Sequence, residues 1–135
     1  NSTEFNKRTK YPVIDLMESQ RAIKIKGGTM RLGAYDCKIK TGTKAFAAYR
    51  SKKISERHRH RYEVNNRYKN KLEKQGLIIS GVNEDLGVVE TIEIADHPWF
   101  IAGQFHPELK SRVKKAHPLF REFIKAATKY NKNRG

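Results

Sequence analysis

The sequence predicts a single α/β domain, and three observations support this fold class. The chain of 135 residues has the length of one domain. Several apolar or alternating runs have the length of β-strands. Two segments carry the start and stop signals of helices. One Trp, six Tyr and six Phe supply bulky side chains for a core, although the hydrophobic fraction is only 37%, against about 45–50% in average domains.

The N-terminal half is predicted to contain two strands and one short helix. An apolar run over residues 12–17 predicts a short strand between two loops. Residues 29–40 predict a longer extended segment with imperfect alternation, which a Thr-Gly-Thr sequence ends. The last residue of that sequence, Thr43, is a candidate N-cap for a helix over residues 44–49.

Two further helices are predicted in the C-terminal half. Asn65 or Asn66 can cap the first through its side-chain oxygen, and Gly76 ends it. The second starts at the His-Pro pair of residues 117–118, because proline suits the first helical turn. From there to Tyr130, apolar residues recur every three or four positions, which is typical of an amphipathic helix.

Three strands complete the predicted sheet. Residues 77–82 form an apolar run. Residues 88–94 alternate between polar and apolar, which predicts a strand with one face in water. Residues 99–105 are almost uniformly apolar, which predicts a strand buried on both faces. The β-α-β units with which such folds open are not recognisable, so we expect the chain to begin part-way through a domain.

The charge balance favours polyanionic partners in principle. The chain has 29 Lys and Arg against 14 Asp and Glu, a formal net charge of +15. The basic residues are nevertheless spread along the whole chain, and the aromatic residues fall within apolar runs instead of standing free to stack on bases. We therefore prefer a solvated basic surface and keep a nucleic-acid-binding module as the alternative.

The remaining features of the composition bear on the cellular location of the chain. No run approaches the roughly 20 apolar residues of a membrane span, and the polar start does not resemble a signal peptide. The single cysteine, Cys37, excludes an internal disulfide and a multi-cysteine metal site. A cytoplasmic location is therefore expected.

The first candidate for chemistry is the sequence Phe105-His106-Pro107-Glu108. It places a histidine directly after a strand, where open α/β sheets carry their active sites. Glu108 can accept a hydrogen bond from one ring nitrogen of His106 and leave the other nitrogen as a general base. The alternative is a loop histidine beside a surface acid.

The second candidate is the alternating run Glu56–Asn65. In an extended strand, its arginines and histidines occupy opposite faces: Arg57, Arg59 and Arg61 on one, and His58, His60 and Tyr62 on the other. Guanidinium groups suit a carboxylate or a phosphate, but a charged edge strand is an equally good interpretation. The two histidines could also ligate a metal, although no third ligand is evident and no metal site is predicted.

Two other features are weak candidates. Cys37 lies mid-strand with no flanking glycine, so we interpret it as a structural thiol and not as a nucleophile. The segment Gly27–Gly33 lacks the Lys-Ser/Thr ending of a phosphate-binding loop, and its glycines are better explained by the start of a strand. The chain thus offers a base and an orienting acid but no nucleophile.

Five segments together resemble the CTP synthase family: Asn1–Phe5, Gly28–Gly33, Glu56–Asn65, His97–Phe100 and Gln104–Glu108. The Phe-His-Pro-Glu sequence is typical of class I glutamine amidotransferases in general, whereas Arg-His-Arg-His-Arg-Tyr-Glu-Val-Asn is much more specific to CTP synthases. The resemblance covers residues 1–130 as the C-terminal part of the amidotransferase domain, with residues 131–135 as a basic tail. It implies the C-terminal half of an open, mostly parallel, flavodoxin-like sheet with flanking helices.

The resemblance also implies an activity. Such a domain hydrolyses glutamine and supplies ammonia for the amination of UTP to CTP, a step of pyrimidine biosynthesis. By the family's motifs, His106 is the general base and Glu108 orients it, while Glu4, Arg61 and the backbone of Tyr62 bind glutamine. The implied partners are a synthase domain, which binds ATP and magnesium, and the N-terminal half of the amidotransferase domain, in a homotetrameric cytoplasmic enzyme. No cofactor is expected in this chain itself.

One departure from the family is large. The nucleophile of the family lies on a Gly-x-Cys-x-Gly turn that precedes the segment matching Asn1–Phe5, and these 135 residues contain no such turn. We therefore expect a fragment that does not hydrolyse glutamine alone and that leaves an apolar edge or face uncovered. The alternative within the superfamily is the amidotransferase part of another synthase, such as those for GMP or carbamoyl phosphate.

Overall fold

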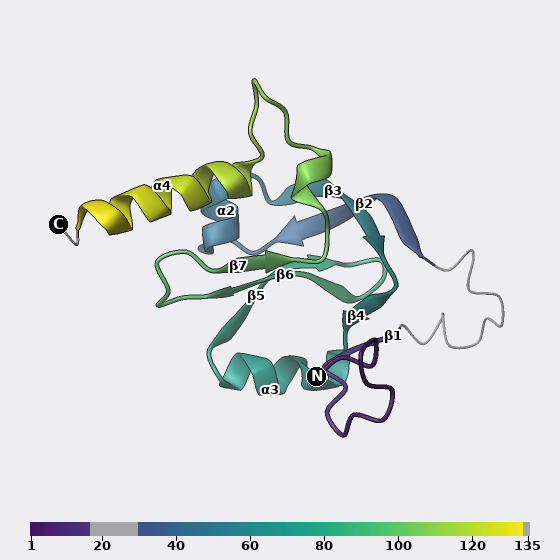
Figure 1. The fold of residues 1–135 in the computed structure, drawn as a ribbon. Coiled ribbons are helices and arrows are strands. Elements are labelled where there is room, and N and C mark those ends of the chain that lie inside the picture. The colour runs from purple at the N-terminus through teal and green to yellow at the C-terminus, as the bar shows by residue number, and fades with distance from the viewer. Residues whose placement is uncertain (17–29, 134–135) are drawn as a thin grey trace.

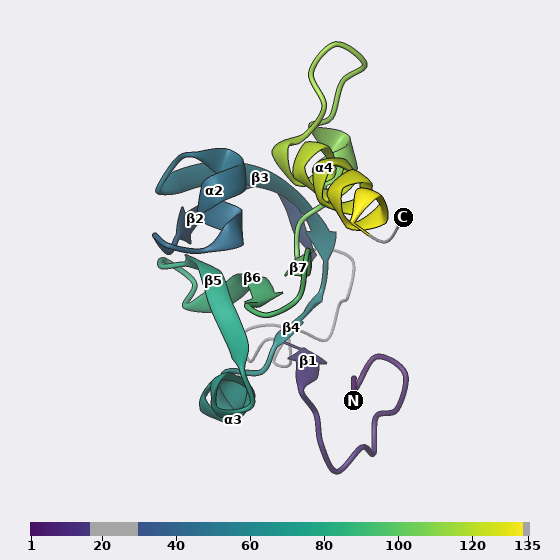
Figure 2. The same cartoon turned by 90° about the vertical axis from the view of Figure 1, so that its left-hand side faces the viewer.

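The computed structural model describes residues 1–16 and 30–133 (Figure 1). In chain order, the elements are β1 (Ile14–Leu16), β2 (Arg31–Ile39), α2 (Lys44–Tyr49), β3 (Lys53–His60), β4 (Tyr62–Val64), the 3-10 turn η2 (Asn66–Tyr68), α3 (Lys69–Lys74), β5 (Leu77–Asn83), β6 (Val88–Ile94), β7 (Ile101–Gly103), the 3-10 turn η3 (Pro107–Leu109) and α4 (Pro118–Lys132). The strands form a five-stranded sheet in the order β3-β2-β5-β6-β7 and a two-stranded sheet of β1 and β4. Figure 2 shows that the larger sheet is curved, with α2 and α4 at one end of the molecule and α3 at the other.

The α/β class is confirmed, but the direction of the strands differs from the expected mostly parallel sheet. Every strand pair within the described residues is antiparallel. The connections explain this, because a parallel crossover needs about a dozen residues or more. Residues 84–87 and 95–100 are too short for one, and residues 40–52 hold only the short helix α2.

Helix α2 forms as its sequence predicts and is capped from two sides. The Thr43 side chain accepts a hydrogen bond from the backbone N–H of Phe46 at 3.1 Å. The Glu93 carboxylate of β6 accepts from the N–H groups of Lys44 at 2.6 Å and Ala45 at 3.2 Å. Three of the N–H groups that a helix start leaves without partners are thus satisfied.

Strand β6 corrects the prediction of a wet face. Glu90, Thr91 and Glu93 are each at most 1% exposed. Each polar side chain has found a partner within the fold: Glu90 accepts from Arg31 at 2.6 Å, Thr91 bonds Ser80 at 3.0 Å, and Glu93 caps α2. The polar side chains of β6 are therefore buried against partners inside the fold and do not form a wet face.

Strand β7 corrects the prediction of a strand over residues 99–105 that is buried on both faces. It spans only Ile101–Gly103, and Ala102 and Gly103 are exposed. The strand is the last in the sheet, so only its β6 side is paired. Within the apolar run, Phe105 is buried at 4% exposure, and Trp99 and Ile101 are partly buried against the core.

The predicted start and end signals of the segment from Asn65 to Gly76 are confirmed. The Asn65 side chain accepts from the N–H of Arg67 at 3.1 Å at the start of η2, and α3 continues from it. Gly76, just beyond α3, has a φ of 89°, a conformation that favours glycine. Gly33 in β2 has a φ of 97°, while residues 27–29 of the same glycine-containing segment lie outside the described residues.

Helix α4 starts as predicted and runs slightly further. Nδ1 of His117 accepts from the N–H of Leu119 at 3.3 Å, and the helix continues to Lys132, two residues beyond the expected boundary. Leu119 is buried, whereas Phe120, Phe123 and Ile124 are 40–60% exposed. An uncovered apolar face was expected, and α4 carries one.

Within the described residues, two small clusters of buried apolar side chains lie between the sheet and the helices α2 and α4. One centres on Cys37, Ile39 and Ala45, and the other on Ala48, Phe105 and Leu119. Ile101 packs against both clusters and joins them. Within the described residues, none of the helices has the length and apolar character needed to cross a membrane.

Candidate functional site

His106 and Glu108 lie in contact, at the end of the segment that follows β7. Nδ1 of His106 is 2.6 Å from Oε1 of Glu108, and this hydrogen bond lowers the pKa of the Glu108 carboxyl. Because an ionised carboxylate only accepts hydrogen bonds, the proton of a neutral His106 lies on Nδ1. Nε2 then keeps its lone pair and has the chemistry of a base.

Strand β3 fixes the position of the His106 loop. The backbone N–H of His106 donates to the carbonyl of Arg57 at 2.8 Å. Four residues later, Nζ of Lys110 donates to the carbonyl of Ser55. Two bonds to one strand thus hold the turn η3 and the histidine that precedes it.

A buried acid holds the far end of the same loop. Oε1 of Glu56 accepts from the Tyr49 hydroxyl at 3.0 Å and from Nε2 of His117 at 2.9 Å. Burial raises the pKa of Tyr49, so its hydroxyl stays protonated as a donor. Because Nδ1 of His117 accepts from Leu119, its proton lies on Nε2. This cluster joins α2, β3 and the start of α4.

The alternating faces predicted for residues 56–60 are confirmed. Glu56 and His58 are buried, and Arg57 and Arg59 are exposed. Arg61 departs from the prediction of three arginines on one face, because it is half-buried at a bend between β3 and β4. The physical reason is that β3 belongs to the five-stranded sheet and β4 pairs with β1, so the chain changes sheets at this residue.

The N-terminal segment lies next to the same two-stranded sheet. Ser2 forms a parallel bridge with Ile14, and β1 in turn pairs with β4, with Leu16 opposite Tyr62. Glu4 follows this bridge and is exposed. The structure therefore brings the segments that carry Glu4, Arg61 and Tyr62 to one small sheet. Their contacts with glutamine stay predictions.

A buried ion network was not predicted from the sequence. Arg31 of β2 donates from Nη1 to Glu63 at 2.9 Å and from Nη2 to Glu90 at 2.6 Å. The three side chains are at most 5% exposed. The sequence signal that could have revealed this network is the presence of two glutamates inside strands of a strongly basic chain. An acid buried in a strand needs a cation close by.

Cys37 is confirmed as a structural thiol, since it is fully buried in β2. Burial raises its pKa to about 12, which keeps the thiol protonated and unreactive near neutral pH. For His58 and His60, considered as metal ligands, the sequence shows no third ligand and predicts no metal site. Among residues 1–16 and 30–133, no group of three or more His, Cys, Asp or Glu side chains is placed to hold a metal ion.

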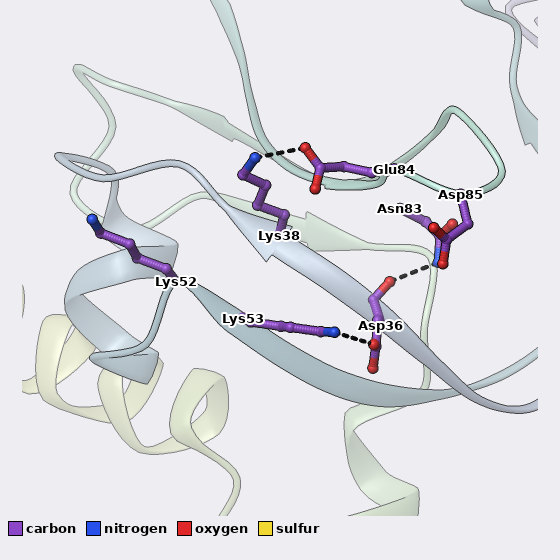
Figure 3. A pocket seen from close by; sticks show the side chains of 7 residues that line it. All are labelled: Asp36, Lys38, Lys52, Lys53, Asn83, Glu84 and Asp85. Carbon is purple, nitrogen blue, oxygen red and sulfur yellow. Dashed lines mark hydrogen bonds and ion pairs between the residues drawn. The ribbon is translucent and has the colours of Figure 1, made fainter.

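A cavity of about 240 Å³ lies at the opposite end of the β2–β3 pair and holds none of the predicted site residues (Figure 3). Its charged side chains are partly paired with one another. Lys38 lies 2.6 Å from Glu84, and Lys53 lies 2.7 Å from Asp36. The pairs are half-exposed or more, which is typical of a solvated surface.

Comparison with known proteins identifies the family. The sequence profile described as "Glutamine amidotransferase class-I" matches residues 6–126, which is most of the chain. This chain belongs to the class I glutamine amidotransferase family. The amidotransferase chain is 59% identical over 132 residues to a CTP synthase of Chlorobium phaeobacteroides, with 98% of the chain and 23% of that relative covered. It is 60% identical over 133 residues to a CTP synthase of Methanosphaera stadtmanae, with 98% and 25% covered.

Solved structures agree with this assignment. The glutaminase domain of Trypanosoma brucei CTPS, solved with bound acivicin, matches with a TM-score of 0.87 and 38% identity, over 96% of this chain and 50% of that one. A Thermoplasma acidophilum protein described as a putative GMP synthase component matches with a TM-score of 0.57 and 18% identity, over 78% and 48%, and supports the fold alone. The resemblance to the CTP synthase family is confirmed. The amidotransferase chain spans about a quarter of the length of the curated relatives.

Proposed function

We propose that this chain supplies the general base, its orienting acid and part of the glutamine-binding surface of the glutaminase site of a CTP synthase. The observation that carries the proposal is the 2.6 Å hydrogen bond between His106 and Glu108, on a loop anchored to β3 within a class I amidotransferase fold. The identity of about 60% to CTP synthases, against 18% to the GMP synthase component, favours this synthase over others.

In the proposed reaction, Nε2 of His106 takes the proton of a cysteine thiol, and the thiolate attacks the side-chain amide carbon of glutamine. The C–N bond breaks, a γ-glutamyl thioester forms, and the proton on His106 passes to the leaving nitrogen, which departs as ammonia. Water then attacks the thioester while His106 accepts its proton, and glutamate and the free thiol are released. Glu108 holds the proton on Nδ1 throughout, so that Nε2 is always the nitrogen that faces the reaction.

Substrate binding follows from charge. The Arg61 guanidinium is suited to the α-carboxylate of glutamine, with the backbone of Tyr62 beside it, and the Glu4 carboxylate is suited to the α-ammonium. Support for this grouping comes from the two-stranded sheet, to which both the N-terminal segment and the Arg61 bend are attached.

The nucleophile is proposed to come from another segment. Cys37 is unsuited because it is fully buried and its pKa is raised to about 12. We place the reactive cysteine on a Gly-x-Cys-x-Gly turn in the N-terminal half of the amidotransferase domain, and we expect no glutamine hydrolysis by this chain alone. A synthase domain that holds ATP and magnesium would use the ammonia to convert UTP to CTP, in a cytoplasmic homotetramer.

A chimera tests the proposal. The 135-residue chain replaces the matching segment of the Chlorobium phaeobacteroides CTP synthase, and CTP formation is measured with glutamine and with ammonia as nitrogen sources. We expect both activities in the chimera. His106→Ala should reduce glutamine-dependent CTP formation by about 10²–10⁴-fold, the usual contribution of a general base, and leave ammonia-dependent formation unchanged.

The ammonia reaction shows that each variant is folded and assembled. Glutamine-dependent synthesis that survives His106→Ala would contradict the assignment of the base. Glu108→Gln serves as the matched variant, because it keeps the shape of the side chain and removes the charge that fixes the proton on Nδ1. It should lower kcat for glutamine hydrolysis by less than His106→Ala does.

A further inference from the structure

Behind the Arg61 bend lies a row of buried polar side chains that the proposed reaction does not use. His58 and His60 belong to β3, and Glu90 belongs to β6. The side chains of His58 and Glu90 are fully buried, and that of His60 is 14% exposed. These residues include the two histidines that make the Arg-His-Arg-His-Arg run unusual. Each contact in the row determines where the next proton lies.

The last contact in the row fixes the proton on His60. Nδ1 of His60 lies 3.1 Å from the carbonyl oxygen of Tyr62. A carbonyl oxygen only accepts hydrogen bonds, so Nδ1 of His60 must be the donor. Burial, together with the charge of Arg31, lowers the pKa of His60 to about 4, so the ring carries one proton near neutral pH. Its Nε2 is therefore an acceptor.

The next contact fixes the proton on His58. Nδ1 of His58 lies 2.8 Å from Nε2 of His60, and since the latter is an acceptor, His58 donates. Burial and Arg31 lower the pKa of His58 to about 3. His58 is thus neutral, with its proton on Nδ1 and a bare Nε2.

The first contact then requires a proton on Glu90. The bare Nε2 of His58 lies 3.3 Å from Oε2 of Glu90, and within the described residues both atoms are buried and have no hydrogen-bond donor. Two buried acceptor atoms close together, each without a donor, are unfavourable, and a carboxylic acid proton on Glu90 supplies the missing donor. Burial raises the pKa of Glu90 to about 7, although Arg31 opposes this.

We propose that Glu90, protonated on Oε2, begins a relay of hydrogen bonds through His58 and His60 to the carbonyl of Tyr62, and that this relay positions the Arg61–Tyr62 bend to receive glutamine. The relay itself is independent of the reaction, whereas its role in glutamine binding rests on the proposed function. Glu90, His58 and His60 are positioning residues, since none of them is assigned a contact with the substrate.

The position of the bend explains why it needs such support. At Arg61 the chain leaves one sheet and enters another. The Tyr62 carbonyl lies one residue beyond this change, and two locked imidazole rings tie it to the centre of β6. Because the bend is held in this way, Arg61 loses little conformational freedom when it binds glutamine, which favours affinity.

The charged and titratable groups around Glu90 come from three strands. Arg31 of β2 donates to its Oε1, and Glu63 of β4 shares that arginine. His58 and His60 of β3 complete the row, and the Glu90 charge contributes to the raised pKa of Cys37 in β2. The charge of a protonated His106 also contributes to the lowered pKa of both relay histidines.

Imidazole nitrogen NMR on the 135-residue chain tests the relay without any substrate. His58 and His60 should both show the Nδ1–H tautomer, whereas His117, which donates from Nε2 to Glu56, should show the opposite tautomer in the same spectrum. His60→Asn and His58→Asn assign the signals. An Nε2–H tautomer at His58 or His60 at pH 6 would overturn the relay.

Kinetics of the chimera test the positioning role. His60→Asn keeps an N–H donor near the place of Nδ1, and His60→Leu removes it at similar size. We expect His60→Leu to raise KM for glutamine about tenfold, in line with the loss of about 1.4 kcal/mol, with a smaller effect on kcat. His60→Asn should stay within about threefold of the parent, because it restores the last bond. Equal KM values in the two variants would refute the positioning role.

Glu90→Gln gives the third arm, because its amide N–H donates toward His58 at every pH. KM for glutamine in the parent chimera should rise as the pH rises through about 7, and KM in Glu90→Gln should not follow this rise. A parallel rise in both would contradict the proton on Glu90. If the tautomers are found but the chimera does not use glutamine, the proposed function fails and the relay stands. If the chimera uses glutamine but His58 or His60 has the other tautomer, the relay fails and the proposed function stands.

Discussion

The two ends of the β2–β3 pair carry ion pairs of similar length in opposite surroundings. At one end, Arg31 lies 2.6–2.9 Å from Glu90 and Glu63, and all three side chains are at most 5% exposed. At the other end, Lys38 lies 2.6 Å from Glu84, and both are about 60% exposed (Figure 3). Distance alone would rank these pairs as equal. Their burial predicts that they differ in almost every measurable property, because water screens one set and not the other.

The largest effect is expected from Arg31→Met. This variant leaves Glu63 and Glu90 buried without the guanidinium that both contact, and removal of one partner from a buried pair typically costs about 3–5 kcal/mol. The free energy of unfolding of the chain, measured with urea, should fall by that amount. A loss below about 1 kcal/mol would show that the buried Arg31 pairs contribute no more than an exposed ion pair, which would contradict the expected difference between the two ends.

An intermediate effect is expected from Glu90→Gln, and its sign depends on pH. The pKa of Glu90 is raised in the fold from 4.5 to about 7. The native state therefore holds a proton that the unfolded state has released, and this stabilises the fold most at low pH and is lost as the pH rises through about 7. Gln has no such proton to lose. The stability of Glu90→Gln relative to the parent should therefore increase by about 1–3 kcal/mol between pH 5 and pH 8.

Chemical denaturation at several pH values measures this difference. Glu84→Gln is the matched control, because it makes the same change at the exposed end. The stability difference between Glu84→Gln and the parent should stay constant over the same range. A constant difference for Glu90→Gln as well would place the proton elsewhere in the network.

The smallest effect is expected from Lys38→Met. Exposed ion pairs contribute about 0–1 kcal/mol, so the unfolding free energy should change by less than about 1 kcal/mol, and less still in 0.5 M salt, where exposed charges are screened. The same salt should leave the cost of Arg31→Met nearly unchanged. A salt-sensitive Arg31→Met would mean that water reaches the buried end.

Local signals in the sequence predicted local structure well. Thr43 and Asn65 cap the segments that follow them, and Gly76 lies just beyond the end of a helix. Glu108 was predicted to contact His106, and the two residues are in fact joined by a short hydrogen bond. In each case the partners lie within three residues, so the chain between them leaves few alternative geometries.

Features that depend on distant partners were not predicted. Glu90 is buried because Arg31 lies beside it, 59 residues away in the sequence. Glu93 is buried because it caps α2 from a distance of 48–49 residues. The polar residues of β6 predicted a wet face, but a sequence pattern cannot distinguish water from a buried arginine as the neighbour of a polar side chain. The exposure of β7 likewise depends on its place at the edge of the sheet and not on its apolar composition.

Strand β3 carries Arg61 directly after its last residue and accepts the backbone N–H of His106 at Arg57. The arginine proposed to bind the substrate is therefore joined covalently to this strand, and the proposed base is joined to it by a hydrogen bond. When that strand moves during thermal fluctuations, Arg61 and His106 move with it. The distance between the substrate-binding arginine and the base then changes less than the distances to their surroundings.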